Sequence, residues 1–104
     1  MNKELFENLK IMHILRMVHR DVKNANIGWS PEFNRWVFLD FGFAKFLKES
    51  IGEKTYTKFI GTFHFMTDEI QQLFLLDRCG RVDFYYNDLY GLEKSFIEIK
   101  EKIK

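Results

Sequence analysis

The sequence lacks the features that anchor a small protein covalently or in a membrane. Its 104 residues contain one cysteine, Cys79, and one proline, Pro31. A single cysteine excludes an internal disulfide and a cysteine-based metal cluster, and it fits a reducing compartment. No apolar run is long enough to span a bilayer, and residues 1–10 are too charged for a signal peptide. We therefore expect a soluble, cytoplasmic chain.

The chain also lacks an excess of either charge. Sixteen Lys and Arg residues against fifteen Asp and Glu residues leave a formal charge of +1, so we expect neither nucleic acid nor an anionic membrane as a partner. No repeat, low-complexity tract or linker interrupts the sequence, which predicts one domain with a modest core. Twelve phenylalanines indicate either bulky aromatic packing or an unusual genomic composition.

One polar stretch, residues 19–26, carries groups that suit a metal-bound phosphate. It is too polar for a core strand and lacks a helical period, so it is predicted to be a loop. It holds the carboxylate of Asp21, the ammonium of Lys23 and the amide of Asn26, and a second carboxylate, Asp40, follows. A carboxylate can take a hydroxyl proton and an ammonium can offset phosphate charge, while carboxylate and amide oxygens are hard ligands for magnesium.

These residues spell H-R-D-x-K-x-x-N and, at residues 40–42, D-F-G, so the chain resembles the catalytic lobe of a eukaryotic protein kinase. Lysine two positions after the loop aspartate resembles the serine/threonine-directed branch. The alternative, a polar turn between two apolar segments, would rarely produce both motifs in this order. The resemblance implies an α+β fold, mainly α, in which helices surround a small β-hairpin that carries the catalytic loop (residues 19–26) and the metal-binding loop.

The resemblance also implies chemical roles, with ATP and Mg²⁺ as cofactors and a protein as substrate. Asp21 would orient the substrate hydroxyl, and Lys23 would steady the transferred phosphoryl group of ATP. Asn26 and Asp40 would hold magnesium. Thr62, in a segment similar to the family's G-T-x-x-Y-M-A-P-E, would contact Asp21 and Lys23.

Further residues have implied structural or regulatory roles. His19 would pack and hydrogen-bond within the loop. Arg20 would bind a phosphate on the activation segment (residues 43–60), the alternative being a solvated surface charge. Thr57 would be the preferred phosphosite, the alternative being an ordinary loop hydroxyl. Glu69 would anchor the substrate-binding segment, although the arginine that usually pairs with it is expected to lie beyond residue 104. Asp88 would accept hydrogen bonds from the catalytic-loop backbone, the alternative being an exposed acid at a helix start.

Hydrophobic periodicity predicts three helices, over residues 3–13, 67–76 and 83–104. The β-prone runs 27–29 and 36–39 flank a proline-containing turn and predict a hairpin.

Several details go with these elements. Residues 44–49 are predicted to form a helical turn. Thr67 is predicted to cap the second helix, and His13 is predicted to be a packed or capping residue rather than a ligand. The apolar stripe over residues 89–103 has almost no remaining sequence to cover it, so we expect self-association through the last helix.

We interpret residues 1–104 as one partial kinase domain that extends from the helix before the catalytic loop to the central helix. The N-terminal lobe and the last helices are expected to be absent. The first hypothesis is a piece of a serine/threonine-type kinase, which phosphorylates proteins with ATP and is inactive as an isolated chain. The second is a non-catalytic docking or regulatory module. The third, a small-molecule kinase, is disfavoured by the segment that begins at Gly61 and Thr62.

Overall fold

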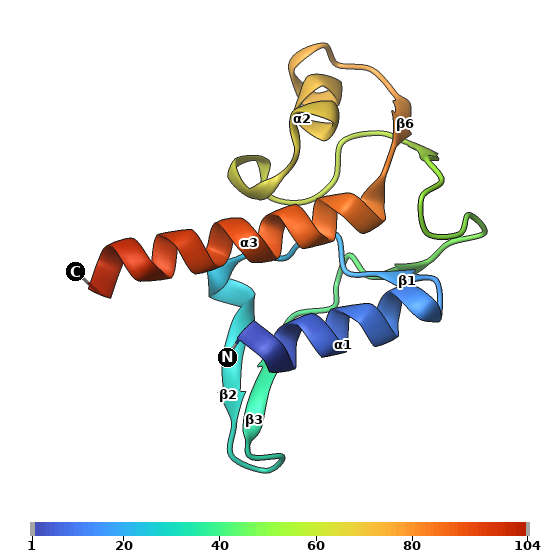
Figure 1. The fold of residues 1–104 in the computed structure, drawn as a ribbon. Helices are drawn as coiled ribbons and strands as arrows, with labels where there is room; N and C mark the ends of the chain where they lie inside the picture. The colour runs from blue at the N-terminus through green and yellow to red at the C-terminus, as the bar shows by residue number, and fades with distance from the viewer. Residues whose placement is uncertain (1, 104) are drawn as a thin grey trace.

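The computed structural model describes residues 2–103 as a small α+β fold (Figure 1). Its helices are α1 (Asn2–Ile14), α2 (Asp68–Leu75) and α3 (Phe84–Ile103), with short 3₁₀ turns η1 (Asn24–Asn26) and η2 (Phe63–Phe65). Its strands are β1 (Met17–Val18), β2 (Ile27–Ser30), β3 (Arg35–Phe38), β4 (Lys45–Phe46), β5 (Thr55–Thr57) and β6 (Gly80–Val82). The strands form three separate antiparallel pairs, β1–β4, β2–β3 and β5–β6. Within residues 2–103, no helix is both long and apolar enough to cross a membrane.

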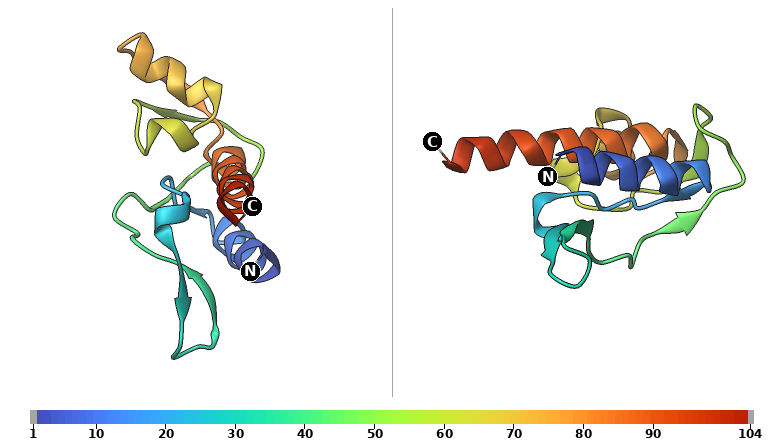
Figure 2. Two further views of the ribbon diagram at one scale, coloured as in Figure 1. Left: turned by 90° about the vertical axis from the view of Figure 1, so that its left-hand side faces the viewer. Right: turned by 60° about the horizontal axis from the view of Figure 1, so that its bottom comes forward.

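The two long helices, α1 and α3, run side by side and share one of two hydrophobic clusters (Figures 1 and 2). Leu5 and Leu9, one turn apart on α1, are fully buried, and so is Leu92 of α3. Their burial follows from the apolar period of α1, which places one row of side chains against its neighbour. The second cluster lies where β6, α2 and the start of α3 meet, and it includes Ile70, Val82 and Phe84.

The burial of Leu92 corrects one expectation from the sequence. The stripe over residues 89–103 is not left uncovered at its start, because Leu89 and Phe96 also pack against the α1 cluster. Ile97 of α3 stays exposed, with 51% of its surface accessible. The side chain of Ile103 lies outside the described residues.

The hairpin predicted from the sequence is confirmed, with Ile27 opposite Phe38 and Ser30 opposite Arg35. Strand β3 is tied to α1 near the hairpin turn, because Glu4 accepts a hydrogen bond from the Trp36 N–H at 2.6 Å. The turn itself points away from the helices (Figure 1), so the hairpin is flanked by α1 rather than surrounded by helices.

The helical turn predicted over residues 44–49 is wrong. Residues 45–46 form β4 and pair with β1, Met17 opposite Phe46. The Leu47 N–H then donates to the Arg16 carbonyl at 2.7 Å. Pairing with an available strand satisfies the backbone groups of this short run, which is too short to form a stable helix by itself.

The second helix begins where the sequence predicts, with Thr67 at the N-cap position, but its hydroxyl caps nothing. The Thr67 oxygen Oγ1 is buried and has no hydrogen-bond partner among the described residues. The Thr67 N–H instead donates to Asn87 Oδ1 of α3 at 3.0 Å. The helix ends at Leu75, slightly before the predicted boundary.

Candidate active site

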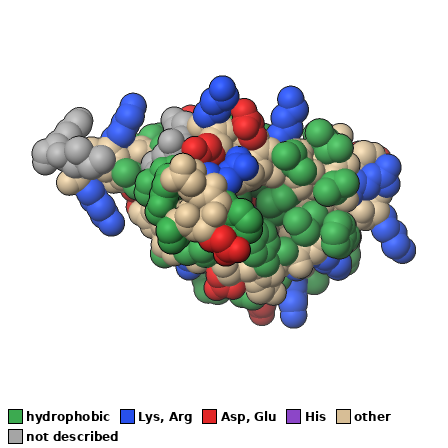
Figure 3. Space-filling model, turned by 90° about the horizontal axis from the view of Figure 1, so that it is seen from below, with side chains coloured by type: hydrophobic (Ala, Val, Ile, Leu, Met, Phe, Trp, Pro, Cys, Tyr) green, Lys and Arg blue, Asp and Glu red, His purple; other side chains and the backbone are tan. Residues whose placement is uncertain are grey.

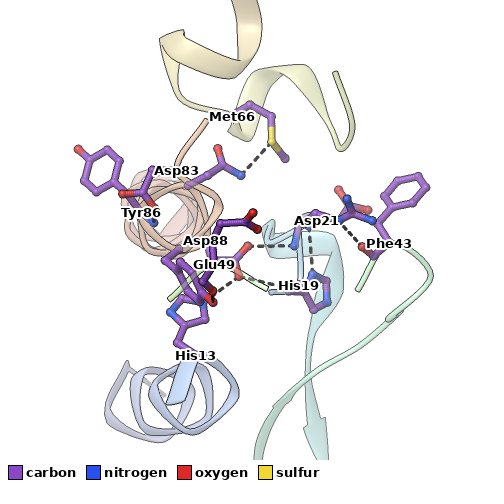
Figure 4. Close-up of polar contacts among 12 residues, drawn as sticks. His13, His19, Asp21, Phe43, Glu49, Met66, Asp83, Tyr86 and Asp88 are labelled. Carbon is purple, nitrogen blue, oxygen red and sulfur yellow. Dashed lines mark hydrogen bonds and ion pairs between the residues drawn. The ribbon is translucent and has the colours of Figure 1, made fainter. Parts of the chain in front are cut away.

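The buried carboxylate of Asp88 links the catalytic loop to α3 (Figure 4). Its Oδ2 accepts the His19 N–H and its Oδ1 accepts the Arg20 N–H, both at 2.9 Å. Arg20 has a φ of 67°, a left-handed conformation that costs free energy for a non-glycine residue. The two hydrogen bonds to Asp88 hold the loop backbone in this conformation.

His19 is fully buried, and both of its ring nitrogens have partners. Nδ1 accepts the Asp21 N–H at 3.1 Å, so the hydrogen must reside on Nε2, which donates to the Leu39 carbonyl at 3.0 Å. A buried imidazole with both nitrogens occupied cannot exchange protons with a substrate without breaking this arrangement. His19 therefore links the loop to the end of β3.

Three predicted site residues, Asp21, Lys23 and Thr62, form one hydrogen-bonded group. The Thr62 hydroxyl donates to Asp21 Oδ1 at 2.7 Å, and Lys23 Nζ donates to Thr62 Oγ1 at 2.9 Å. Lys23 Nζ also lies 3.9 Å from Asp21 Oδ1. The turn before Thr62 requires Gly61, because its φ is 111° and a Cβ there would lie 2.6 Å from the Arg20 carbonyl oxygen.

Asn26 is buried beside this group with its amide orientation fixed. Asn26 Nδ2 donates to the Asp21 carbonyl at 2.9 Å and to Asp21 Oδ2 at 3.1 Å. Because the NH₂ group is used, the amide oxygen is the atom left to bind a ligand. A neutral amide oxygen of this kind suits a hard cation such as Mg²⁺.

Asp40 lies at the same end of the hairpin as Asn26, just after β3. The Leu39 N–H donates to the Asn26 carbonyl at 2.7 Å. Asp40 directly follows Leu39, the residue that is hydrogen-bonded to Asn26. Asp40 is exposed, has a φ of 50°, and accepts the Gly42 N–H on Oδ1 at 3.1 Å. An exposed carboxylate and a fixed amide oxygen at one end of a hairpin fit a magnesium ion that keeps water and phosphate as its other ligands.

Arg20 and Thr57 make separate contacts in this structure. The Arg20 Nε–H donates to the Phe43 carbonyl at 2.6 Å, and the guanidinium lies 5.3 Å from the centre of the Phe84 ring. Burial lowers the pKa of Arg20 from its ordinary value, and the nearby Asp88 carboxylate opposes that shift. The Thr57 hydroxyl donates to the Lys58 carbonyl at 2.8 Å.

Glu69 has two partners that sequence reasoning did not identify. Its Oε1 forms an ion pair with Lys54, and its Oε2 accepts the Asp83 N–H at 3.0 Å. No motif marks Lys54, which is one of several lysines in the activation segment. The strand pairing that brings it near Glu69 is set by long-range contacts.

Two further residues lie around the catalytic loop: His13, which is buried as the sequence predicts, and Gly91, whose role was not predicted. His13, at the end of α1, contacts Asp88 Oδ2 through Nε2 at 3.0 Å. Gly91 lies on α3, and a Cβ there would lie 2.5 Å from the Val22 carbonyl oxygen. Gly91 thus allows α3 to approach the catalytic loop closely.

The comparisons with known proteins agree with this geometry. The protein kinase domain family matches residues 1–77. A probable serine/threonine-protein kinase of Dictyostelium discoideum is 32% identical over 80 residues, which make up 76% of this chain and 14% of that protein. Mitogen-activated protein kinase kinase 9 of Arabidopsis thaliana is 28% identical over 97 residues, or 93% of this chain and 30% of that protein.

A putative serine/threonine-protein kinase/receptor of Acanthamoeba polyphaga mimivirus is 34% identical over 92 residues, or 86% of this chain and 5% of that protein. The chain thus spans less than a third of each of these three relatives. The family match covers the loop that holds Asp21, Lys23 and Asn26, together with Asp40 and Thr62. This chain belongs to the protein kinase domain family.

Proposed function

We propose that this chain is the catalytic-lobe part of a serine/threonine-type protein kinase, which transfers phosphoryl groups from ATP to protein hydroxyls. The observation that carries the proposal is the hydrogen-bonded group of Asp21, Lys23 and Thr62, with Asn26 directly behind it. Phosphoryl transfer depends mainly on positioning and charge, and these four side chains fix both within one loop and one turn.

Each side chain has a definite task in this proposal. Asp21 Oδ1, now bonded to the Thr62 hydroxyl, is the atom that would accept a hydrogen bond from the substrate hydroxyl. Lys23 would hold its ammonium toward the transferred group. Asn26 anchors the Asp21 carboxylate through its NH₂ group and would offer its oxygen to the metal, which Asp40 would bind from the same end of the hairpin. Magnesium, when bound with ATP, would neutralise phosphate charge.

The 104-residue chain by itself is proposed to be inactive. Asp40 is exposed, and so are its neighbours Leu39 and Phe41. Because 44% of Leu39 and 47% of Phe41 are accessible, a nucleotide at this end of the hairpin would be held mainly through its phosphates and metal. The residue pattern and the named relatives support the serine/threonine preference, the use of ATP and a protein substrate.

Magnesium-dependent nucleotide binding tests the proposal. We expect MgATP to shift the NMR signals of the catalytic loop in the unsubstituted chain, and the shifts to weaken when magnesium is omitted. Asp40→Asn should remove most of the magnesium dependence. Asp77→Asn is the matched control, because Asp77 is also exposed and has a similar φ of 47°. If both variants bind MgATP like the unsubstituted chain, the metal-binding role of Asp40 is wrong.

A further inference from the structure

The activation segment is tied down at the β5–β6 pair, close to the candidate site. Thr55 pairs with Val82 and Thr57 pairs with Gly80. Four residues, 58–61, separate β5 from Thr62, whose hydroxyl contacts Asp21. The position of β5 therefore limits where Thr62 can lie.

The Glu69 carboxylate contacts residues at one end of this strand pair. Lys54 directly precedes β5 and Asp83 directly follows β6, so they flank the same Thr55–Val82 pair. Glu69 binds both, Lys54 through Oε1 and the Asp83 N–H through Oε2. The hydrogen bond and the charge of Glu69 raise the pKa of Lys54 above its ordinary value, so the ammonium form is favoured.

The Lys54–Glu69 ion pair also joins the two ends of the segment that contains Thr62. Lys54 and Glu69 are separated by 15 positions, and Thr62 lies near the middle of that interval. Joining the two ends of such a segment reduces the number of conformations available to the residues between them. Thr62 is thus restrained by its own contacts and by the closure of the loop that contains it.

We propose that Lys54 is a positioning residue that, with Glu69, locks the β5–β6 pair and restrains the segment that presents Thr62 to Asp21. The positioning role rests on the proposed kinase function, but the lock itself does not. Glu69 is anchored by contacts within residues 54–83. The lock holds a surface segment, because 55% of the Lys54 side chain and 34% of the Glu69 side chain are accessible.

Amide hydrogen exchange on the full 104-residue chain, without nucleotide, tests the lock. We expect Lys54→Met to speed exchange at residues 55–57 and 81–82 by about two- to fivefold, the range for one exposed ion pair. Exchange in the α1–α3 cluster should not change. Lys54→Arg should restore slow exchange, because it keeps the charge. Lys58→Met is the matched control, since Lys58 is an exposed lysine of the same segment.

Exchanging the two charges tests whether the effect comes from the ion pair or from either residue alone. We expect Lys54→Glu and Glu69→Lys each to speed exchange, and the double variant to recover part of the protection. In a completed kinase that carries these residues, Lys54→Met should raise the KM for the protein substrate with the KM for ATP unchanged, and Lys54→Arg should reverse this.

Three results would overturn the lock. The first is equal exchange in Lys54→Met and the unsubstituted chain. The second is equal acceleration by Lys54→Met and Lys58→Met. The third is fast exchange of β5 and β6 in the unsubstituted chain, because no strand pair would then exist to be locked. Since exchange needs no catalysis, failure of the lock and failure of the proposed kinase function are distinguishable.

Discussion

The imidazole Nε2 of His13 lies 3.0 Å from the Asp88 carboxylate, although 75 positions separate the two residues in the sequence. The same carboxylate accepts the backbone N–H groups of His19 and Arg20. Asp88 therefore joins α1, α3 and the catalytic loop at one buried point, and 1% of its surface is accessible.

Asp88→Asn should lower the free energy of unfolding by about 1–3 kcal/mol, because an amide NH₂ would replace an acceptor that faces buried donors. Urea unfolding followed by tryptophan fluorescence measures this change. Asp77→Asn, an exposed control, should change the free energy of unfolding by less than about 0.5 kcal/mol. Equal unfolding midpoints for the Asp88 variant and the unsubstituted chain would show that the carboxylate does not hold the loop.

Gly91→Ala should also destabilise the chain, although alanine favours helices over glycine by about 1 kcal/mol. The new Cβ would lie 2.5 Å from the Val22 carbonyl oxygen and 3.2 Å from the Val22 Cβ, so α3 and the loop would have to separate. Overpacking of this kind costs about 1–3 kcal/mol. Thermal unfolding should show a lower Tm for Gly91→Ala and an unchanged Tm for Glu93→Ala, an exposed position on the same helix. A higher Tm for Gly91→Ala would mean that no close contact exists.

Thr57 rather than Thr55 should be the phosphosite that Arg20 senses in a completed kinase. The Thr55 hydroxyl donates to Glu49 Oε1 at 3.0 Å, so a phosphate on Thr55 would face a carboxylate. To bind phosphate, Arg20 would have to give up its contact with the Phe43 carbonyl.

Mass spectrometry of the active kinase should find phosphate on Thr57, and Thr57→Ala should lower activity more than Thr55→Ala. Arg20→Lys should remove the response to phosphorylation. If the double variant Thr55→Ala with Thr57→Ala keeps full activity and the same dependence on Arg20, the switch does not exist.

The isolated chain should self-associate through the face between α1 and α3. A groove of about 560 Å³ lies there, lined by residues that include Phe6, Tyr86 and Ile97, and each of these three is more than half exposed. Hydrophobic side chains are also visible over much of the surface seen from below (Figure 3). Exposed apolar surface of this kind favours association.

Light scattering should show a concentration-dependent increase in mass, which Phe6→Glu with Ile97→Glu should reduce. Ile51→Glu, which adds a charge at an exposed loop position, should not reduce it. A monomer at all concentrations would contradict this prediction.

The sequence predicted most of the local structure of this chain. Local patterns predicted α1 and the β2–β3 hairpin. These patterns are the apolar period over residues 3–13 and the β-prone runs around Pro31. The motifs also selected Asp21, Lys23, Asn26 and Thr62, which the structure brings into one hydrogen-bonded group.

What sequence reasoning missed depends on contacts between distant segments. Residues 45–46 became a strand because β1 was there to pair with them. The partnership of Lys54 with Glu69 depends on the β5–β6 pair, and the need for glycine at position 91 depends on how closely α3 approaches Val22. None of these has a local pattern, since each depends on where a distant part of the chain lies.

The central claim is that Asp21 acts on the substrate hydroxyl, whereas Asn26 and Asp40 serve the metal. The most direct test is Asp21→Asn in a completed kinase, with radiolabelled phosphoryl transfer and ATP affinity measured on the same preparation. We predict that transfer falls by about 10²–10⁴-fold, the usual contribution of a positioned base, with ATP affinity nearly unchanged. Undiminished transfer, or an equal loss of transfer and ATP affinity, would contradict the role of Asp21.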